Sequence, residues 1–301
     1  MSEQREAPSG SRARRTVAAA AARGTAVADR GSRWVEAQHP GSRRGATIGC
    51  VRRYRAADGQ LYALLLATYF FLTIVPILIV EAGYVYSDPT ALATRIEHRL
   101  GLSGATAHLF STVLVGAGEH RFVSVLLAVL NLVVFGMGFG RVLQLAHARS
   151  WGIDLRGSQL VDQARYVSVL MGMVGLTFLY VLQTRLLAGH SPWIGRLLDI
   201  GWLALLIGFF VWAPRLLLHR RVSARDLLPG AIFTVLGLIV MRLISTILLV
   251  RWLDSYSNTY GALGIVMAIF FWIIAEATVI VIAAAVSPAL AERRDWIEGR
   301  L

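Results

Sequence analysis

The sequence predicts an all-α, polytopic membrane protein with six transmembrane helices. Hydrophobic residues make up 56% of the 301-residue chain and charged residues only 16%, whereas a soluble domain carries about 25% charged residues. Six apolar runs each have the length that crosses a 30 Å hydrocarbon core. Because the runs are continuously apolar, a strand barrel, which alternates apolar and polar residues, is not expected. The runs are Leu61–Val80, Phe122–Leu143, Tyr166–Leu187, Leu197–Leu218, Leu228–Val250 and Gly261–Val286.

The placement of the basic residues predicts the orientation of the chain. All 30 basic residues are arginines, and the formal net charge is +12. Counted together with any arginine in the last four residues of the run, the segments after the second and fourth runs hold four arginines each, against two after the third run and one after the fifth. Short cytoplasmic loops are enriched in basic residues. We therefore expect both termini to lie in the cytoplasm.

The N-terminal region predicts a tail and not a folded domain. Residues 1–60 hold twelve arginines against five acidic residues and few large apolar side chains. We expect residues 1–50 to form a disordered, basic cytoplasmic tail, 51–290 a six-helix transmembrane domain and 291–301 a short cytoplasmic tail. The basic tail predicts contact with membrane lipids through anionic head groups. Nucleic acid is not expected as a partner, because most arginines flank apolar runs.

The segment between the first two runs, residues 81–121, is expected on the outer side. Leu92, Ile96 and Leu100 recur there every four residues, a spacing that favours a short amphipathic helix. Such a helix either caps the bundle or lies on the outer membrane surface.

Three polar residues inside the runs are the main candidates for function. Counted from the outer ends of their runs, Arg242 lies about 12 Å deep, Asn131 about 13.5 Å and Glu276 about 22 Å. The levels of Arg242 and Glu276 therefore differ by about 10 Å on this count. A charged group at the bilayer centre costs about 2.5 to 3.5 kcal/mol. Either Arg242 snorkels outward and Glu276 makes a structural hydrogen bond, or the three residues line a functional polar cavity.

The first run adds Tyr69, Thr73 and Pro76 to this candidate intramembrane site. Pro76 has no backbone N–H and is predicted to kink its helix. Thr73 is placed to bond a carbonyl that the kink frees. The kink would serve either packing or gating.

An enzyme is not expected. The seven histidines are scattered and form no metal-binding pattern, and no Gly-x-Ser-x-Gly nucleophile motif occurs. The single cysteine, Cys50, cannot form an intrachain disulfide or build a zinc site alone. We expect no catalytic residue, no metal and no cofactor.

Three motifs in order resemble the YihY/BrkB family of bacterial inner-membrane proteins. Residues 67–76 read Ala-Thr-Tyr-Phe-Phe-Leu-Thr-Ile-Val-Pro, and residues 225–231 read Arg-Asp-Leu-Leu-Pro-Gly-Ala. Residues 260–264 read Tyr-Gly-Ala-Leu-Gly and are followed by Trp272. With the six-run pattern, the resemblance covers about residues 50–290. It implies a multi-pass protein of the bacterial inner membrane.

The resemblance also implies a role in the cell envelope. The family is linked to envelope integrity, serum resistance and export of lipid or lipid-linked material, and some members carry a ribonuclease label that this sequence does not support. Where members often carry Gly-Ala-Glu late in the last helix, this chain has Ala283, Ala284 and Ala285, with Glu276 as the nearest acid. Ile274 stands where a tyrosine is frequent. Two functions stay open: a transporter of lipid or other anionic envelope material, and a non-transporting envelope scaffold.

Overall fold

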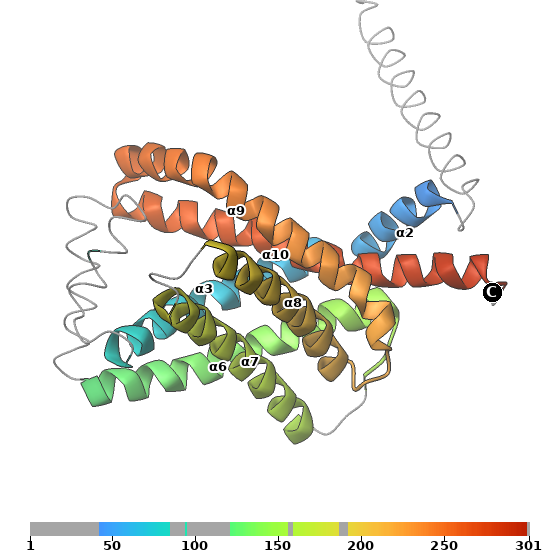
Figure 1. Ribbon diagram of the computed structural model, residues 1–301, viewed down its shortest axis with the longest axis horizontal. Helices are drawn as coiled ribbons and strands as arrows, with labels where there is room; N and C mark the ends of the chain where they lie inside the picture. The colour runs from blue at the N-terminus through green and yellow to red at the C-terminus, as the bar shows by residue number, and fades with distance from the viewer. Residues whose placement is uncertain (1–41, 85–93, 95–120, 156–158, 187–191, 300–301) are drawn as a thin grey trace, which may run out of the picture. The chain divides into compact units, whose positions relative to one another are not determined.

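The computed structural model describes residues 42–84, 94, 121–155, 159–186 and 192–299. These residues form helices joined by short turns, with no β-strand among them, so the predicted all-α class is confirmed. The helices are labelled in Figure 1. They are α2 (Arg43–Ala56), α3 (Gly59–Tyr84), α6 (Arg121–Trp151), α7 (Gln159–Leu186), α8 (Pro192–Leu217), α9 (Ala224–Tyr260) and α10 (Ala262–Ile297).

The chain divides into two compact units. The larger unit runs from Cys50 to Ala291 and holds all the features discussed below. The smaller unit combines the residues up to Gly49 with those from Glu292 onward. Within its described part, the Ser42 hydroxyl caps the first turn of α2 by accepting a 2.8 Å hydrogen bond from the Gly45 N–H.

Each predicted apolar run falls within, or almost within, one helix. Four helices among the described residues are long and apolar enough to cross a membrane: α6, α8, α9 and α10. A fifth span is obtained if α2 and α3, which meet at a 65° bend, count as one. The run Tyr166–Leu187 lies in α7, which is not among these candidates, so the number six stays a prediction. The orientation also stays a prediction, and the expected outer amphipathic helix lies outside the described residues.

Several helices extend well beyond their apolar runs. The predicted loop between Gln144 and Arg165 is mostly helical, because α6 continues to Trp151 and α7 begins at Gln159. Hydropathy marks the part of a helix that suits hydrocarbon, whereas the helix itself ends where its backbone turns. For α6 that point is Gly152, which has a φ of +64° and places the Ile153 N–H on the Ala148 carbonyl.

Small residues bring the helices of the larger unit together. The α3 helix packs on α6, α6 packs on α7, and α8 packs on α9 (Figure 1). Gly138 of α6 lies directly against the Tyr69 ring of α3, and Gly140 lies against Tyr166 of α7. A Cβ at either glycine would collide with its neighbour. These glycines therefore allow the helix backbones to approach each other closely.

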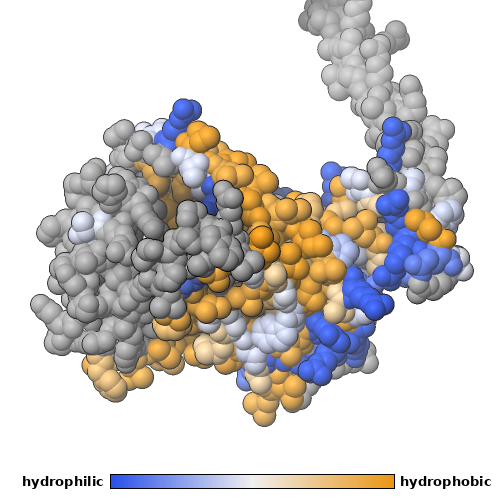
Figure 2. Space-filling view, viewed as in Figure 1, coloured by the Kyte–Doolittle hydropathy of each residue, from blue (hydrophilic) through white to orange (hydrophobic). Residues whose placement is uncertain are grey.

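The outer faces of the bundle are strongly apolar. Figure 2 shows hydrophobic residues covering much of the visible surface between the more polar parts. On α6 and α9 large apolar side chains stand exposed at helical spacing, and an aqueous protein would bury such faces. The faces are suited to lipid. The exposed residues include Leu126, Leu130, Val134, Leu236, Val240, Leu243 and Ile247.

Candidate functional site

A cavity of about 590 Å³ lies inside the larger unit. Six helices contribute to its walls, and most lining side chains are aliphatic or aromatic. Along α9 the lining residues run from Leu227 to Arg242, which is about 22 Å of helix. The volume is in the range of ligand-binding pockets, about 300 to 1,000 Å³. The wall residues that matter below are Phe70, Phe139, His147, Trp202, Phe209, Leu238, Arg242, Glu276 and Ser287.

Arg242 and Glu276, the two charged residues singled out from the sequence, both line this cavity. Contacts between α9 and α10 give their relative level. Gly230 lies against Ser287, and Gly237 lies against Val279. The two helices are antiparallel, so a step of five residues forward from Gly237 on α9 matches a step of five residues back from Val279 on α10. Arg242 therefore lies opposite residue 274. Glu276 is then only about 3 Å away along the helix axis.

This register corrects the offset of about 10 Å that the sequence suggested. The earlier figure counted residues from the outer ends of two apolar runs. Helix α9 continues past the end of its run at Val250 to Tyr260, whereas α10 starts at Ala262, where its run begins. The core cluster at the start of α10 agrees with this register to about one helical turn, because Leu253 of α9 clusters with Ile265 and Ala268.

The two charged side chains are not joined in the described part of the chain. Glu276 Oε1 accepts a 2.9 Å hydrogen bond from the Trp272 indole N–H, one turn earlier on α10. No ion pair links Glu276 with Arg242 there. Ser245 and Thr246, three and four residues after Arg242 on α9, donate to the Arg242 and Leu243 carbonyls of their own helix. Polar groups near Arg242 thus bond within α9.

The other predicted site residues lie elsewhere or outside the described side chains. Asn131 is exposed on α6 and donates a 2.9 Å hydrogen bond to the Leu127 carbonyl of its own helix. Thr73 is fully buried and donates to the Phe70 carbonyl. Tyr69 packs on Gly138. None of the three lines the cavity. Pro76 lies within α3, but its side chain is not described, so its kink stays a prediction.

Sequence reasoning missed several polar residues on the cavity wall, among them His147 and Ser287. His147 of α6 lines the cavity, and its Nδ1 donates a 2.9 Å hydrogen bond to the Leu143 carbonyl. Ser287 of α10 accepts a 3.0 Å hydrogen bond from the Gly230 N–H. The spacing of Ser287 from Glu276, eleven residues or three helical turns, puts both on one face of α10 and could have revealed this.

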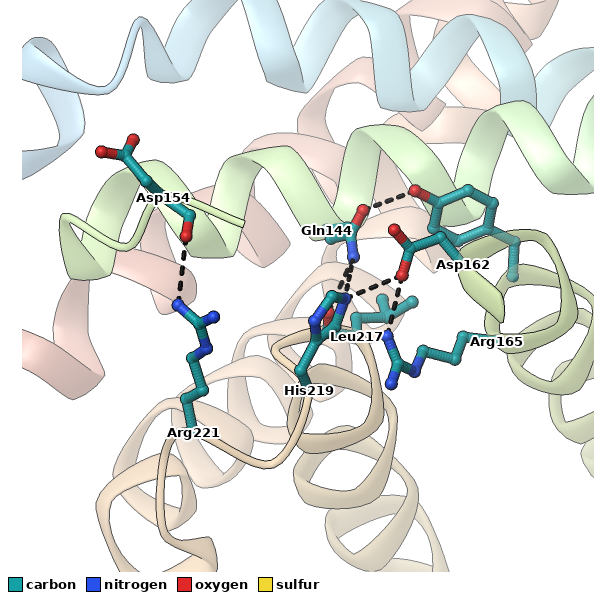
Figure 3. A network of polar contacts seen from close by, with 8 residues as sticks. Gln144, Asp154, Asp162, Arg165, Leu217, His219 and Arg221 are labelled. Atoms are coloured by element: carbon teal, nitrogen blue, oxygen red, sulfur yellow. Dashed lines mark hydrogen bonds and ion pairs between the residues drawn. The ribbon is translucent and has the colours of Figure 1, made fainter. Parts of the chain in front are cut away.

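A second polar cluster, the end network, ties α6 and α7 to the turn after α8 (Figure 3). The Gln144 amide donates a 2.8 Å hydrogen bond to the Leu217 carbonyl and accepts one from the Tyr166 hydroxyl. His219 Nε2 lies 2.7 Å from Asp162 Oδ1, which also accepts a 2.8 Å hydrogen bond from Arg165. We define the end network as Gln144, Asp162, Arg165, Tyr166 and His219.

The end network sits on a constrained turn. His219 and Arg220 have φ values of +55° and +59°, a region that non-glycine residues seldom adopt. Arg221, next along the chain, donates a 3.1 Å hydrogen bond to the Asp154 carbonyl (Figure 3). These bonds hold the turn between α8 and α9 against the α6–α7 connection. The network therefore fixes how the helices meet at this end.

Neither cluster has the composition of a metal site. No group of three or more His, Cys, Asp or Glu side chains that could hold a metal ion occurs among the described residues. The cavity offers hydrogen-bonding and charged groups in an apolar chamber, an arrangement suited to holding an amphiphile.

Comparison with known proteins identifies one match. A family model described as "Virulence factor BrkB" matches residues 50–300. No curated protein and no solved structure matches the chain.

Proposed function

Since the chain belongs to the BrkB virulence-factor family of bacterial membrane proteins, we propose that it transports a lipid or other anionic envelope amphiphile. The match confirms the family that the three motifs indicated. The transporter is proposed for the bacterial inner membrane, with both termini in the cytoplasm. It is proposed as a carrier and not as an enzyme.

The observation that carries this proposal is Arg242 on the wall of a largely apolar cavity. A guanidinium in such a place is costly unless a partner neutralises it. An anionic head group, above all a phosphate, can supply that partner through paired hydrogen bonds. The aromatic and aliphatic walls then accommodate the apolar part of the same molecule.

The rival proposal is a non-transporting scaffold whose basic tail holds anionic lipid. It rests on the twelve arginines among residues 1–60, since each arginine near an anionic surface contributes about 1 kcal/mol. This scaffold would be impaired more by removal of residues 1–45 than by a change at Arg242. The transporter would show the reverse order.

The test is lipid movement in reconstituted liposomes. Arg242→Leu should reduce the movement of fluorescent phospholipids, tested with an anionic and with a zwitterionic head group, by at least about tenfold. Arg251→Leu is the matched control, because Arg251 lies on the same helix and is exposed like Arg242, but does not line the cavity. Equal rates for wild type and both variants, with correct folding shown by circular dichroism, would contradict the transporter proposal.

A further inference from the structure

The charge balance of the cavity points to a narrower class of ligand. Among the described lining residues, Arg242 is the basic side chain that stays charged and Glu276 is the acidic one. His147 and Tyr180 are the other titratable groups on the wall. The cavity therefore presents one cationic and one anionic group when both residues are ionised.

The positions of these two groups suit a ligand with two charges. Arg242 and Glu276 stand within about 3 Å of the same level, on neighbouring antiparallel helices. No ion pair joins them in the described part of the chain, where Glu276 accepts a hydrogen bond from Trp272. A carboxylate has about four acceptor positions, so one indole N–H leaves capacity for a donor from the ligand.

A simple monoanion fits this arrangement poorly. It would neutralise Arg242 and leave the Glu276 carboxylate as an unpaired charge in an apolar chamber. A zwitterion with adjacent phosphate and ammonium groups neutralises both side chains at once. The apolar part of the ligand would lie along the remaining wall, which includes Phe70, Phe139 and Phe209.

We infer that the cavity selects a zwitterionic amphiphile, with its phosphate at Arg242 and its ammonium group at Glu276. This inference rests on the proposed function and names the substrate class of that site. The phosphate accepts from the guanidinium, and the ammonium group donates to the carboxylate. The Trp272 N–H fixes the orientation of the carboxylate.

Binding of two short-chain probe lipids to the purified full-length protein tests the inference directly. One probe carries a phosphoethanolamine head group, and the other carries a phosphoglycerol head group on the same dihexanoyl chains. Native mass spectrometry at neutral pH measures the affinity of each. Wild type should prefer the phosphoethanolamine probe by at least about tenfold. Glu276→Gln, which keeps the shape and removes the charge, should abolish the preference.

Asp199→Asn is the matched control. Asp199 is an exposed carboxylate on α8 that does not line the cavity, so its loss should leave the preference unchanged. If the wild-type protein bound the two probes with equal affinity, that result alone would overturn the inference. A Glu276→Gln protein that keeps the wild-type preference would overturn it as well.

The same probes in liposomes separate this inference from the proposed function. If the protein bound the phosphoethanolamine probe selectively but moved neither lipid, the result would contradict the transporter proposal and support the zwitterion site. Movement of both lipids at equal rates would support transport and overturn the zwitterion site.

Discussion

The end network and the cavity hold polar groups in opposite ways. In the end network, hydrogen bonds connect α6, α7 and the turn after α8, so that Gln144 and Asp162 each serve two partners. In the cavity, Arg242 and Glu276 lie at nearly the same level of their helices, and no ion pair joins them among the described residues. Glu276 accepts a hydrogen bond from a tryptophan of its own helix. A satisfied polar cluster stabilises a fold, whereas an unsatisfied one is suited to a ligand.

This difference predicts that stability and transport separate by region. Changes in the end network should lower the free energy of unfolding and leave the cavity chemistry intact. Changes at the charged cavity residues should do the reverse. The four predictions below test that separation, from the largest expected effect on stability to the smallest.

Removing Asp162 should have the largest effect on stability. Asp162 is largely buried and pairs with both His219 and Arg165, so Asp162→Ala leaves two partners unpaired. We expect the free energy of unfolding to fall by about 3 kcal/mol. Equilibrium unfolding in mixed micelles measures the change. A loss below about 0.5 kcal/mol would mean that the network does not hold the helices together.

Adding a methyl group at Gly230 should have the next largest effect. Its Cβ would collide with the Ser287 hydroxyl and approach the Ala283 carbonyl oxygen to 2.7 Å. Gly230→Ala should therefore destabilise the protein by about 1 to 3 kcal/mol through overpacking between α9 and α10. The melting temperature of Gly230→Ala is compared with that of Gly175→Ala, where an added Cβ would meet no atom within 4 Å. The difference reports the cost of the contact between α9 and α10. Equal melting temperatures would argue against the α9–α10 register.

Arg242→Leu should change stability by less than about 1 kcal/mol although it removes the cation on which the proposed transport depends. The reason is that no described ion pair depends on the Arg242 side chain, and leucine suits an apolar wall. Unfolding in the same micelles measures the effect. A loss of 3 kcal/mol or more, about that of Asp162→Ala, would assign Arg242 a structural role.

Asn131→Leu should have the smallest effect. The Asn131 side chain is exposed and bonds only the Leu127 carbonyl of its own helix. We expect stability within about 0.5 kcal/mol of wild type and unchanged lipid movement in liposomes. A clear loss of transport would return Asn131 to the functional site that the sequence suggested.

Hydropathy and motifs predicted much of the fold because both are local properties of the chain. Apolar runs located helices α3 and α6 to α10, and three motifs predicted the family that the match to residues 50–300 confirms. Membrane crossing is supported for four or five helices.

The site was predicted only in part, because helix rotation and register are not local properties. Arg242 and Glu276 could be singled out as costly groups in apolar runs, yet their common level depends on how α9 packs against α10. Asn131 is likewise a polar residue inside an apolar run, but its side chain is exposed and does not line the cavity. The end network was missed because Gln144 and Asp162 lie where hydropathy predicted a loop.

The most direct test of the account compares two tryptophan substitutions on α9 that differ only in the face they occupy. Leu238 lines the cavity, whereas Val240 is 51% exposed on the outer face. Lipid movement in liposomes should fall by at least about tenfold in Leu238→Trp, because the added ring fills the chamber. Val240→Trp should move lipid at the wild-type rate. Equal rates for the two variants, each correctly folded, would contradict the claim that this cavity is the path of the ligand.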